Sequence, residues 1–315
     1  MIYNLTIIIP FYNSEKFILK NLDIFLKIPK KFNIEIIYID NNSTDKAFSI
    51  ISKRIKDLKD IKLFKTNKQL GMGPGIARNL GVLKSNSKYI LFVDVDDYLE
   101  INYFEKLIKY IKKTNYNFIY LKKKLITINN LKTKLSPYLK YNKNNLSEFF
   151  IKSNNMQAIS IIFKKKFLLE NKLKFQRGIF EDIFYLFKCH YFNSSEIGYF
   201  SYDIYIKINN SYSITGASKT FDHIKFKFNA WKSIEIFLKK NISKNIFKKL
   251  DNDIQYRWRG EFSNEFEQIM KSKLSKKKKV LFVNYIKKLY KNFINREFLI
   301  TTYKDKQTKK ELFNV

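Results

Sequence analysis

The stretch Tyr89–Glu100, YILFVDVDDYLE, joins apolar residues suited to a buried strand to three aspartates within four positions. Alternate side chains of a strand share a face, so we expect Asp94 and Asp96 to point the same way while Val95 points into the core. Two carboxylates held this close repel each other unless a cation lies between them. A hard divalent cation, Mg²⁺ or Mn²⁺, prefers such oxygen ligands. The alternative interpretation is an Asp-rich turn before an Asp-capped helix.

The first hundred residues repeat this transition from an apolar run to a polar loop. Runs at residues 5–10, 34–40, 61–67 and 89–97 alternate with amphipathic helical patterns. The alternation predicts an α/β fold with a mostly parallel sheet and helices on both faces. Ligands of such sheets bind outside the carboxyl ends of the strands. We therefore expect the clusters FYN, DNNSTD, GMGPGIARN and DVDD to converge on one site.

The charge of the chain predicts anionic partners. Its 315 residues include 61 basic and 28 acidic ones, a formal net charge of +33. Residues 1–100 hold 16 basic and 11 acidic residues, so most of the excess lies beyond the segment with the aspartates. Phosphorylated substrates, an acidic membrane surface or nucleic acid would suit it. AT-rich coding bias is an equally good account of the many lysines.

The cysteine content and the hydropathy pattern indicate the cellular compartment of the protein. Cys189 stands alone in the sequence, and no Cys/His spacing suits zinc. No signal peptide and no run of 18 apolar residues is found. We expect a cytoplasmic protein, either soluble or peripheral at the inner face of the cytoplasmic membrane.

Four segments carry a family resemblance. TIIIPFYNSEKFI, EIIYIDNNSTD, GPGIARNLG and YILFVDVDD, in this order, resemble the successive motifs of family 2 glycosyltransferases with the GT-A fold, inverting enzymes, here of the bacterial surface-glycan type. Further on, NKLKFQRGIFEDIFYLFKCHYF is similar to the acceptor-side segment and INNSYSIT to the segment that closes over the diphosphate. Nothing past about residue 220 carries the resemblance.

The resemblance implies a division of the chain. Residues 1–220 would form a GT-A catalytic domain with a Rossmann-like, mostly parallel sheet flanked by helices. Its residues 1–100 would bind the nucleotide-sugar and residues 101–220 the acceptor. A Lys-rich helical C-terminal region would occupy residues 221–315.

The resemblance also implies site residues. The residues that would bind a nucleotide-sugar donor, first of all a UDP-sugar, are Pro10, Phe11, Tyr12, Asn13, Asp40, Asn41, Gly73, Arg78, Asp94, Val95 and Asp96. Asp94 and Asp96 match the Asp-x-Asp motif and would hold Mn²⁺ or Mg²⁺, with Asp97 supporting. Asn41 stands where the family commonly has an Asp, which leaves the nucleotide open. His223, as a further metal ligand, and Lys207 would approach the diphosphate unless both are structural or solvent-facing.

Single-step inversion requires a base on the acceptor side. Asp182 is the candidate, with Glu181 as acceptor positioner or alternate base. The alternative is an ordinary acidic first turn of a helix, which the helix dipole favours. The acceptor would be a glycan or a lipid-linked molecule in the biosynthesis of capsule, lipooligosaccharide or polysaccharide.

Two features leave alternatives open. In KKKKVLFVNYIKKLYKNFI, residues Leu281, Tyr285, Leu289 and Phe293 form a stripe that suits either an anionic membrane surface or packing on the catalytic domain. A nucleic-acid-binding or other basic interaction protein on an α/β nucleotide-binding fold would explain the charge. Such a nucleic-acid-binding protein has no need of three clustered carboxylates, so nucleic acid is not the expected partner. A nucleotidyltransferase would want glycines after the first strand, and IIPFYNSEK has none.

Overall fold

The computed structural model describes residues 3–67, 73–127, 130–134, 143–152, 156–208, 220–272 and 274–293. The chain divides into two compact units. Residues 1–143 and 154–217 form the first, which we call the sheet unit, and residues 144–153 and 218–315 form the second, the helical unit. That residues 144–153 belong with the C-terminal helices is not evident from the sequence pattern.

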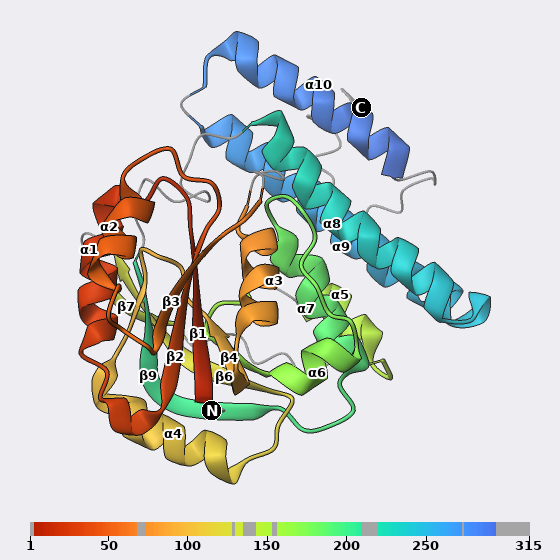
Figure 1. Cartoon of the computed structure of the whole chain (residues 1–315). Coiled ribbons are helices and arrows are strands. Elements are labelled where there is room, and N and C mark those ends of the chain that lie inside the picture. Colours follow the sequence, from red (N-terminus) through yellow and green to blue (C-terminus); the bar gives the residue numbers. More distant parts are fainter. Residues whose placement is uncertain are drawn as a thin grey trace. The chain divides into compact units, whose positions relative to one another are not determined.

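The sheet unit alternates strands and helices (Figure 1). Its strands are β1 (Tyr3–Phe11), β2 (Ile34–Asp40), β3 (Ile61–Lys65), β4 (Ser87–Phe92), β5 (Tyr98–Leu99), β6 (Phe118–Thr127), β7 (Asn130–Lys134), β8 (Ile161–Lys164) and β9 (Gly198–Ile208). Its α-helices are α1 (Glu15–Leu26), α2 (Ala47–Arg54), α3 (Gly75–Lys84), α4 (Phe104–Lys113), α6 (Lys165–Glu170) and α7 (Glu181–Phe192), and 3-10 turns lie at Lys30–Phe32 and Ile101–Tyr103.

The strands of the described chain form one sheet in the order β3-β2-β1-β4-β8-β6-β9-β5, with β7 paired to β6. Strands β1 to β4 pair in parallel, as the sequence predicts. Strand β8 runs antiparallel to β4 and β6, and β5 runs antiparallel to β9, whereas β6 and β9 are parallel. The sheet is therefore mixed, and its parallel half is the one built from the first hundred residues.

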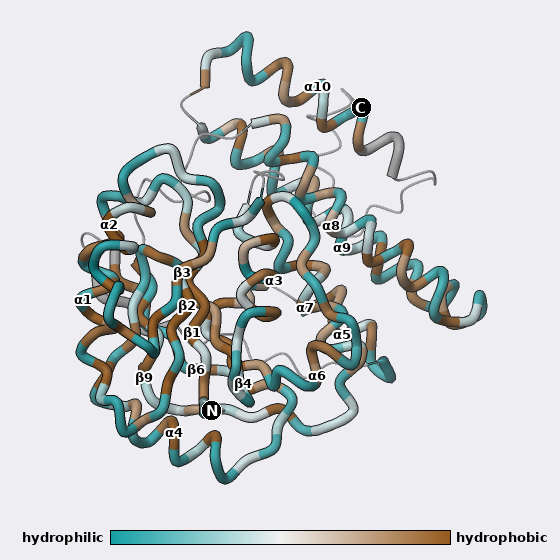
Figure 2. Tube along the Cα trace, viewed as in Figure 1, coloured by the Kyte–Doolittle hydropathy of each residue, from teal (hydrophilic) through white to brown (hydrophobic). Residues whose placement is uncertain are grey.

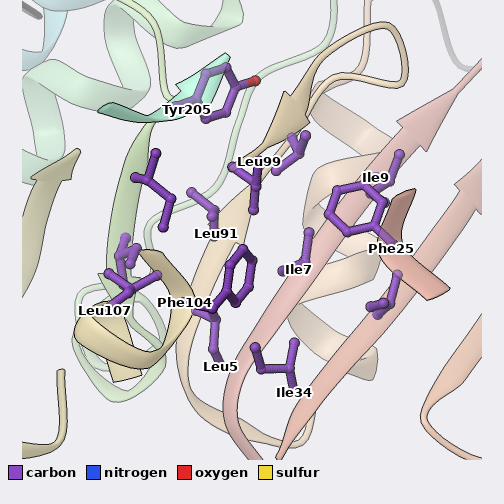
Figure 3. Close-up of a cluster of buried hydrophobic side chains, with 14 of the residues drawn as sticks. Leu5, Ile7, Ile9, Phe25, Ile34, Leu91, Leu99, Phe104, Leu107 and Tyr205 are labelled. Atoms are coloured by element: carbon purple, nitrogen blue, oxygen red, sulfur yellow. The ribbon is translucent and has the colours of Figure 1, made fainter. Parts of the chain in front are cut away.

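Strand alternation sorts the core into two layers. Leu5, Ile7 and Ile9 pack with apolar residues of α1, α2 and α4 (Figure 3). Ile8, on the other face of β1, packs with residues of α3, α6 and α7, which include Tyr185. Figure 2 shows the central strands as the most hydrophobic part of this unit. Helices on both faces thus confirm the expected α/β architecture.

The fourth strand is shorter than predicted. It ends at Phe92, and the Asp-rich segment is a turn in which the Asp97 amide donates to the Asp94 carbonyl oxygen at 3.0 Å. Strand alternation is therefore the wrong reason for the proximity of Asp94 and Asp96, because a turn folds them together. Val95 packs against the core, as expected.

The helical unit consists, in its described residues, of α5 (Leu146–Lys152), α8 (Phe221–Asn241), α9 (Lys244–Lys271) and α10 (Lys276–Phe293). This confirms a helical C-terminal region. Its core is aromatic, with Phe228 stacked on Phe262 at 4.3 Å between ring centroids. The buried Lys227 ammonium is neutralised by Glu261 at 2.6 Å and Glu265 at 2.8 Å.

The predicted apolar stripe of α10 is displaced by one residue. Among the α10 side chains that the structure describes, Phe282 and Ile286 are the buried ones, and Phe282 stacks on Phe221 at 4.4 Å. Of the predicted stripe, Tyr285 contacts Phe221 at 5.2 Å, while Leu281 is 51% exposed. No helix within the described ranges combines the length and apolar character needed to cross a membrane.

A close contact between α3 and β1 gives a first prediction. A Cβ atom on Gly81 would lie 2.4 Å from the Ile8 side chain, so Gly81→Ala should lower the free energy of unfolding by about 1–3 kcal/mol. Gly260 in α9 is the matched control, because its Cβ would meet nothing within 4 Å. Gly260→Ala should be neutral or stabilising by up to about 1 kcal/mol. Urea denaturation measures both, and equal effects would contradict the packing argument.

Candidate functional site

The polar loops of the sheet unit are joined into one site by side-chain hydrogen bonds. The loops after β1 and β2 meet where the Asn13 Oδ1 atom accepts from the Thr44 amide at 2.8 Å. Asn41 of the second loop donates to the Gly73 carbonyl oxygen at 3.3 Å, which joins it to the start of α3. Arg78 in α3 then contacts Asp94 at 2.9 Å. The four clusters therefore converge as the sequence predicts.

Arg78 is the centre of this site. Its side chain is 3% exposed, and its guanidinium lies 2.9 Å from Asp94, 2.7 Å from Glu181 and 3.3 Å from Asp182. Phe175 contributes a cation-π contact at 5.4 Å from the ring centroid. Burial works to lower the pKa of Arg78, but the charges of Asp182, Asp94 and Glu181 outweigh burial and raise it. One cation thus ties the Asp-x-Asp turn to the acidic start of α7.

The acidic pair at the start of α7 holds a proton near neutral pH. Burial raises the pKa of Glu181 to about 8, the charge of Asp182 adds to this, and Arg78 opposes it. Burial also raises the pKa of Asp182, again against Arg78. Three ionised carboxylates around one buried guanidinium repel one another, which favours protonation of one of them. We place the shared proton on Glu181, whose side chain is 5% exposed against 17% for Asp182.

Asp97 supports the Asp-x-Asp turn from inside the protein. Its Oδ1 accepts from the Ile208 amide and its Oδ2 from the Tyr205 hydroxyl, each at 2.8 Å. Burial raises the pKa of Asp97 to about 7, and Lys207 opposes the rise. The carboxylate therefore fastens β9 to the turn. Tyr205 is a site residue that the sequence analysis missed, because β9 looks like any other strand until its pairing is known.

The turn offers oxygen atoms that suit a divalent metal. Within the described residues, ligand atoms of Asp94, Asp96 and Asp97 lie within 4.8 Å of one another. Both oxygens of Asp97 accept hydrogen bonds and one oxygen of Asp94 faces Arg78, so the fit rests on Asp96 and the other oxygen of Asp94. His223 belongs to α8 of the helical unit, and its role as a metal ligand stays a prediction.

The predicted site residues at the ends of β1 and β2 differ in exposure and in hydrogen bonding. Pro10 and Phe11 are buried, whereas Tyr12 is 45% exposed. Asp40 accepts from the Ser43 amide at 2.8 Å through Oδ1, while its Oδ2 finds no hydrogen-bond partner among the described residues and lies 3.6 Å from Lys65. Asn41 uses its carbonyl oxygen for Thr66 at 3.3 Å and its NH₂ group for the third loop.

The glycine loop approaches another part of the protein. Gly73 has a φ of +96°, and a Cβ atom there would lie 2.1 Å from the carbonyl oxygen of Gly178, whose φ is +113°. Phe180, the residue before α7, also has a positive φ of 63°. The close main-chain contact of Gly73 is therefore with the loop before α7, and the part of Gly73 in donor binding stays a prediction.

Two lysines adjoin the carboxylates. Lys207 lies 4.0 Å from Asp94 and 3.9 Å from Asp97, and its approach to the diphosphate stays a prediction. Lys123, which the sequence analysis missed in a run of three lysines, donates to Gln157 at 3.1 Å. Burial and then Lys207 lower the pKa of Lys123 to about 8. The segment INNSYSIT, expected to close over the diphosphate, lies outside the described residues apart from Ile208.

The mixed sheet of the sheet unit, with helices on both faces, is the fold of the GT-A class of transferases. The structure is similar to that of Staphylococcus aureus TarS 1–349 in complex with UDP-GlcNAc, with a TM-score of 0.67 over 91% of this chain and 81% of that one. The two chains are 19% identical, so this likeness concerns the fold.

The chain belongs to glycosyl transferase family 2, whose model matches residues 6–169. A Haemophilus influenzae protein described as an uncharacterized glycosyltransferase is 38% identical over 107 residues, 34% of this chain and 41% of the relative. The poly(ribitol-phosphate) beta-glucosyltransferase of Bacillus spizizenii is 31% identical over 182 residues, 56% of this chain and 27% of the relative. The matches thus span less than half of these relatives' lengths.

Removal of Arg78 should destabilise the sheet unit. Arg78→Met would leave three carboxylates facing one another in a buried site, at a cost of about 3–5 kcal/mol in the free energy of unfolding. Arg78→Lys should recover only part of this, because an ammonium cannot contact three carboxylates as a planar fork does. Arg54→Met is the control, since the Arg54–Asp23 pair is about half exposed and should cost about 0–1 kcal/mol. Similar losses at both positions, measured by urea denaturation, would refute the central role of Arg78.

The raised pKa of Glu181 gives a pH prediction. Its value in the folded state, about 8, lies above that of an unfolded Glu, so the folded protein binds the extra proton. The stability linked to this proton is complete below the unfolded pKa and is lost as pH rises through about 8. Glu181→Gln should therefore flatten the decline of stability between pH 5 and 9, while the exposed Glu196→Gln should not. Parallel curves for wild type and Glu181→Gln would show that Glu181 is ionised throughout.

Proposed function

We propose that the protein is a metal-dependent, inverting glycosyltransferase that transfers a sugar from a nucleotide-sugar, a UDP-sugar first of all, to a bacterial surface-glycan acceptor. The observation that best supports this proposal is the guanidinium of Arg78, which contacts both Asp94 and Asp182. The first belongs to the donor motif and the second to the acceptor-side segment. A group bound at one would therefore lie beside a group bound at the other.

Asp182 suits the part of the base. In the reaction the acceptor oxygen attacks the anomeric carbon, the bond from that carbon to the diphosphate oxygen breaks, and the hydroxyl proton passes to the carboxylate. Burial raises the pKa of Asp182, and a carboxylate with a raised pKa is the better proton acceptor near neutral pH. Arg78 at 3.3 Å holds this side chain in place.

Glu181 suits a positioning role. Its side chain is enclosed and lies 2.7 Å from Arg78, so it fixes the guanidinium and does not reach outward. The proton on Glu181 limits the negative charge around Asp182. This arrangement favours Asp182 over Glu181 as the base.

Asp96 and the Asp94 oxygen that does not face Arg78 would hold Mn²⁺ or Mg²⁺. Such an ion, when bound, neutralises charge on the departing nucleoside diphosphate. The residues of the chain bind and orient the donor, and Asp97 keeps the turn in place through Tyr205 and Ile208.

The donor and acceptor classes are supported by the relatives. TarS has been solved in complexes named for UDP-GlcNAc and UDP, which favours a UDP-sugar. The Bacillus relative is named for a poly(ribitol-phosphate) acceptor, so a glycan or polyol-phosphate chain of the cell surface is the proposed acceptor class. The exposed Leu281 and Val280, beside the lysines of α10, are the proposed contact with an anionic membrane surface at the cytoplasmic side.

Asp182→Asn tests the mechanism. The variant should bind UDP as the wild type does and should lose at least about 99% of sugar transfer, because removal of a general base costs about 10²–10⁴-fold. Binding is measured by the thermal shift that UDP, GDP or CDP produces with and without Mn²⁺, and transfer by release of nucleoside diphosphate. The exposed Glu196→Gln is the control and should retain full turnover. Unchanged turnover in Asp182→Asn would exclude it as the base, and the absence of any nucleotide-dependent shift in the wild type would overturn the proposed function.

A further inference from the structure

Lys123 and Lys207 lie on one face of two neighbouring strands. In the parallel pair of β6 and β9, Lys123 is in register with Tyr205, and Leu125 with Lys207. Side chains two residues apart in a strand share a face, so both lysines flank Tyr205 on the same side of the sheet. Tyr205 is buried and donates to Asp97. The two lysines therefore stand beside the Asp-x-Asp turn.

The two ammonium groups have different partners. Lys207 lies about equally far from Asp94 and Asp97, at 4.0 and 3.9 Å. Among the described residues, the hydrogen bond of the Lys123 ammonium goes to the neutral side-chain oxygen of Gln157 at 3.1 Å. An ammonium has three N–H donors, so this contact uses one of them. Lys123 is thus a partly buried cation placed beside another cation, with a neutral acceptor.

Such a pair of neighbouring cations carries an electrostatic cost. Burial deprives Lys123 of water, and the neighbouring positive charge of Lys207 adds repulsion, which together lower the pKa of Lys123 to about 8. Asp97, Asp94 and Asp182 act on the pKa of Lys123 in the opposite direction, so Lys123 is near enough to interact with the Asp-x-Asp turn and with Asp182. An anion that bridged both ammonium groups would remove the repulsion and use the remaining donors.

We propose that Lys123, together with Lys207, binds the diphosphate of the donor nucleotide. The inference rests on the proposed function, and it adds a pair of fixed protein cations to the metal site. Only the diphosphate portion of a nucleotide-sugar carries the negative charge that suits this pair beside Asp94 and Asp96. As the bond to the anomeric carbon breaks, charge grows on the departing phosphate oxygen, and the two ammonium groups stabilise it without transfer of a proton. Part of the diphosphate affinity is therefore independent of divalent metal.

Calorimetric titration with UDP and with UMP, in the presence of EDTA, tests this assignment. Lys123→Met keeps the length of the side chain and removes its charge. It should weaken UDP binding by about tenfold or more, the loss expected for one charge-assisted hydrogen bond, and leave UMP binding within about twofold. Lys123→Arg should retain most of the UDP affinity.

Lys122→Met is the matched control, because the neighbouring Lys122 pairs with Asp203 at 3.2 Å, and it should leave UDP binding unchanged. Any of three results would overturn the proposal. These are an equal weakening of UDP and UMP binding in Lys123→Met, an unchanged UDP affinity in that variant, and binding of UDP by the wild type only when metal is present. None of these results contradicts the proposed function as long as the wild type binds UDP in the presence of Mn²⁺. A wild-type protein that binds no nucleoside diphosphate under either condition would overturn both.

Discussion

The candidate site depends on one buried cation. Arg78 sits in α3, which packs on β1 through Gly81, and its guanidinium contacts carboxylates from a turn 16 residues further on and from a helix more than 100 residues further on. A buried arginine is tolerated only where its charge is met. Here three carboxylates meet it, and burial raises the pKa of two of them, Glu181 and Asp182. The protein thus brings its Asp-x-Asp turn and the acidic pair of α7 together by an electrostatic requirement of the folded state.

Carboxylates of the Asp-x-Asp turn are also paired with other cations and hydrogen-bond donors. Asp97 is fixed by Tyr205 and the Ile208 amide, and Lys207 lies close to both Asp97 and Asp94. Asp94, Asp97, Glu181 and Asp182 therefore each stand near a cation or a hydrogen-bond donor of the protein. This accounts for the dense cluster of carboxylates in a strongly basic chain. The acids gather where a metal and fixed cations can be held together, and the wider positive surface suits anionic partners.

Much of the fold could be predicted from local patterns. The parallel half of the sheet follows from apolar runs that alternate with amphipathic helices, and the helix that begins with Glu181 and Asp182 was expected at its observed position. The exact end of the fourth strand could not be predicted, because VDVDD satisfies a strand pattern as well as a turn. Three links of the site depend on long-range pairing: the Arg78 bridge to α7, the Tyr205 contact and the position of Lys123. Sequence spacing carries no information about them until the register of β6, β8 and β9 is known. The roles of the individual site residues in binding stay predictions.

The contact between Gly73 and Gly178 limits how closely the loop that starts α3 can approach the loop that leads into α7. Main chain meets main chain there, with no side chain between them. The separation of the loop that starts α3 from the loop that leads into α7 is therefore defined by the thickness of the backbone, and it cannot be tuned by exchanging one side chain for another. Relatives that accommodate bulkier donors or acceptors with this contact intact must gain the space elsewhere. The variable walls of the site are thus to be sought among the side chains of β6, β9 and the strand ends, and not between these two loops.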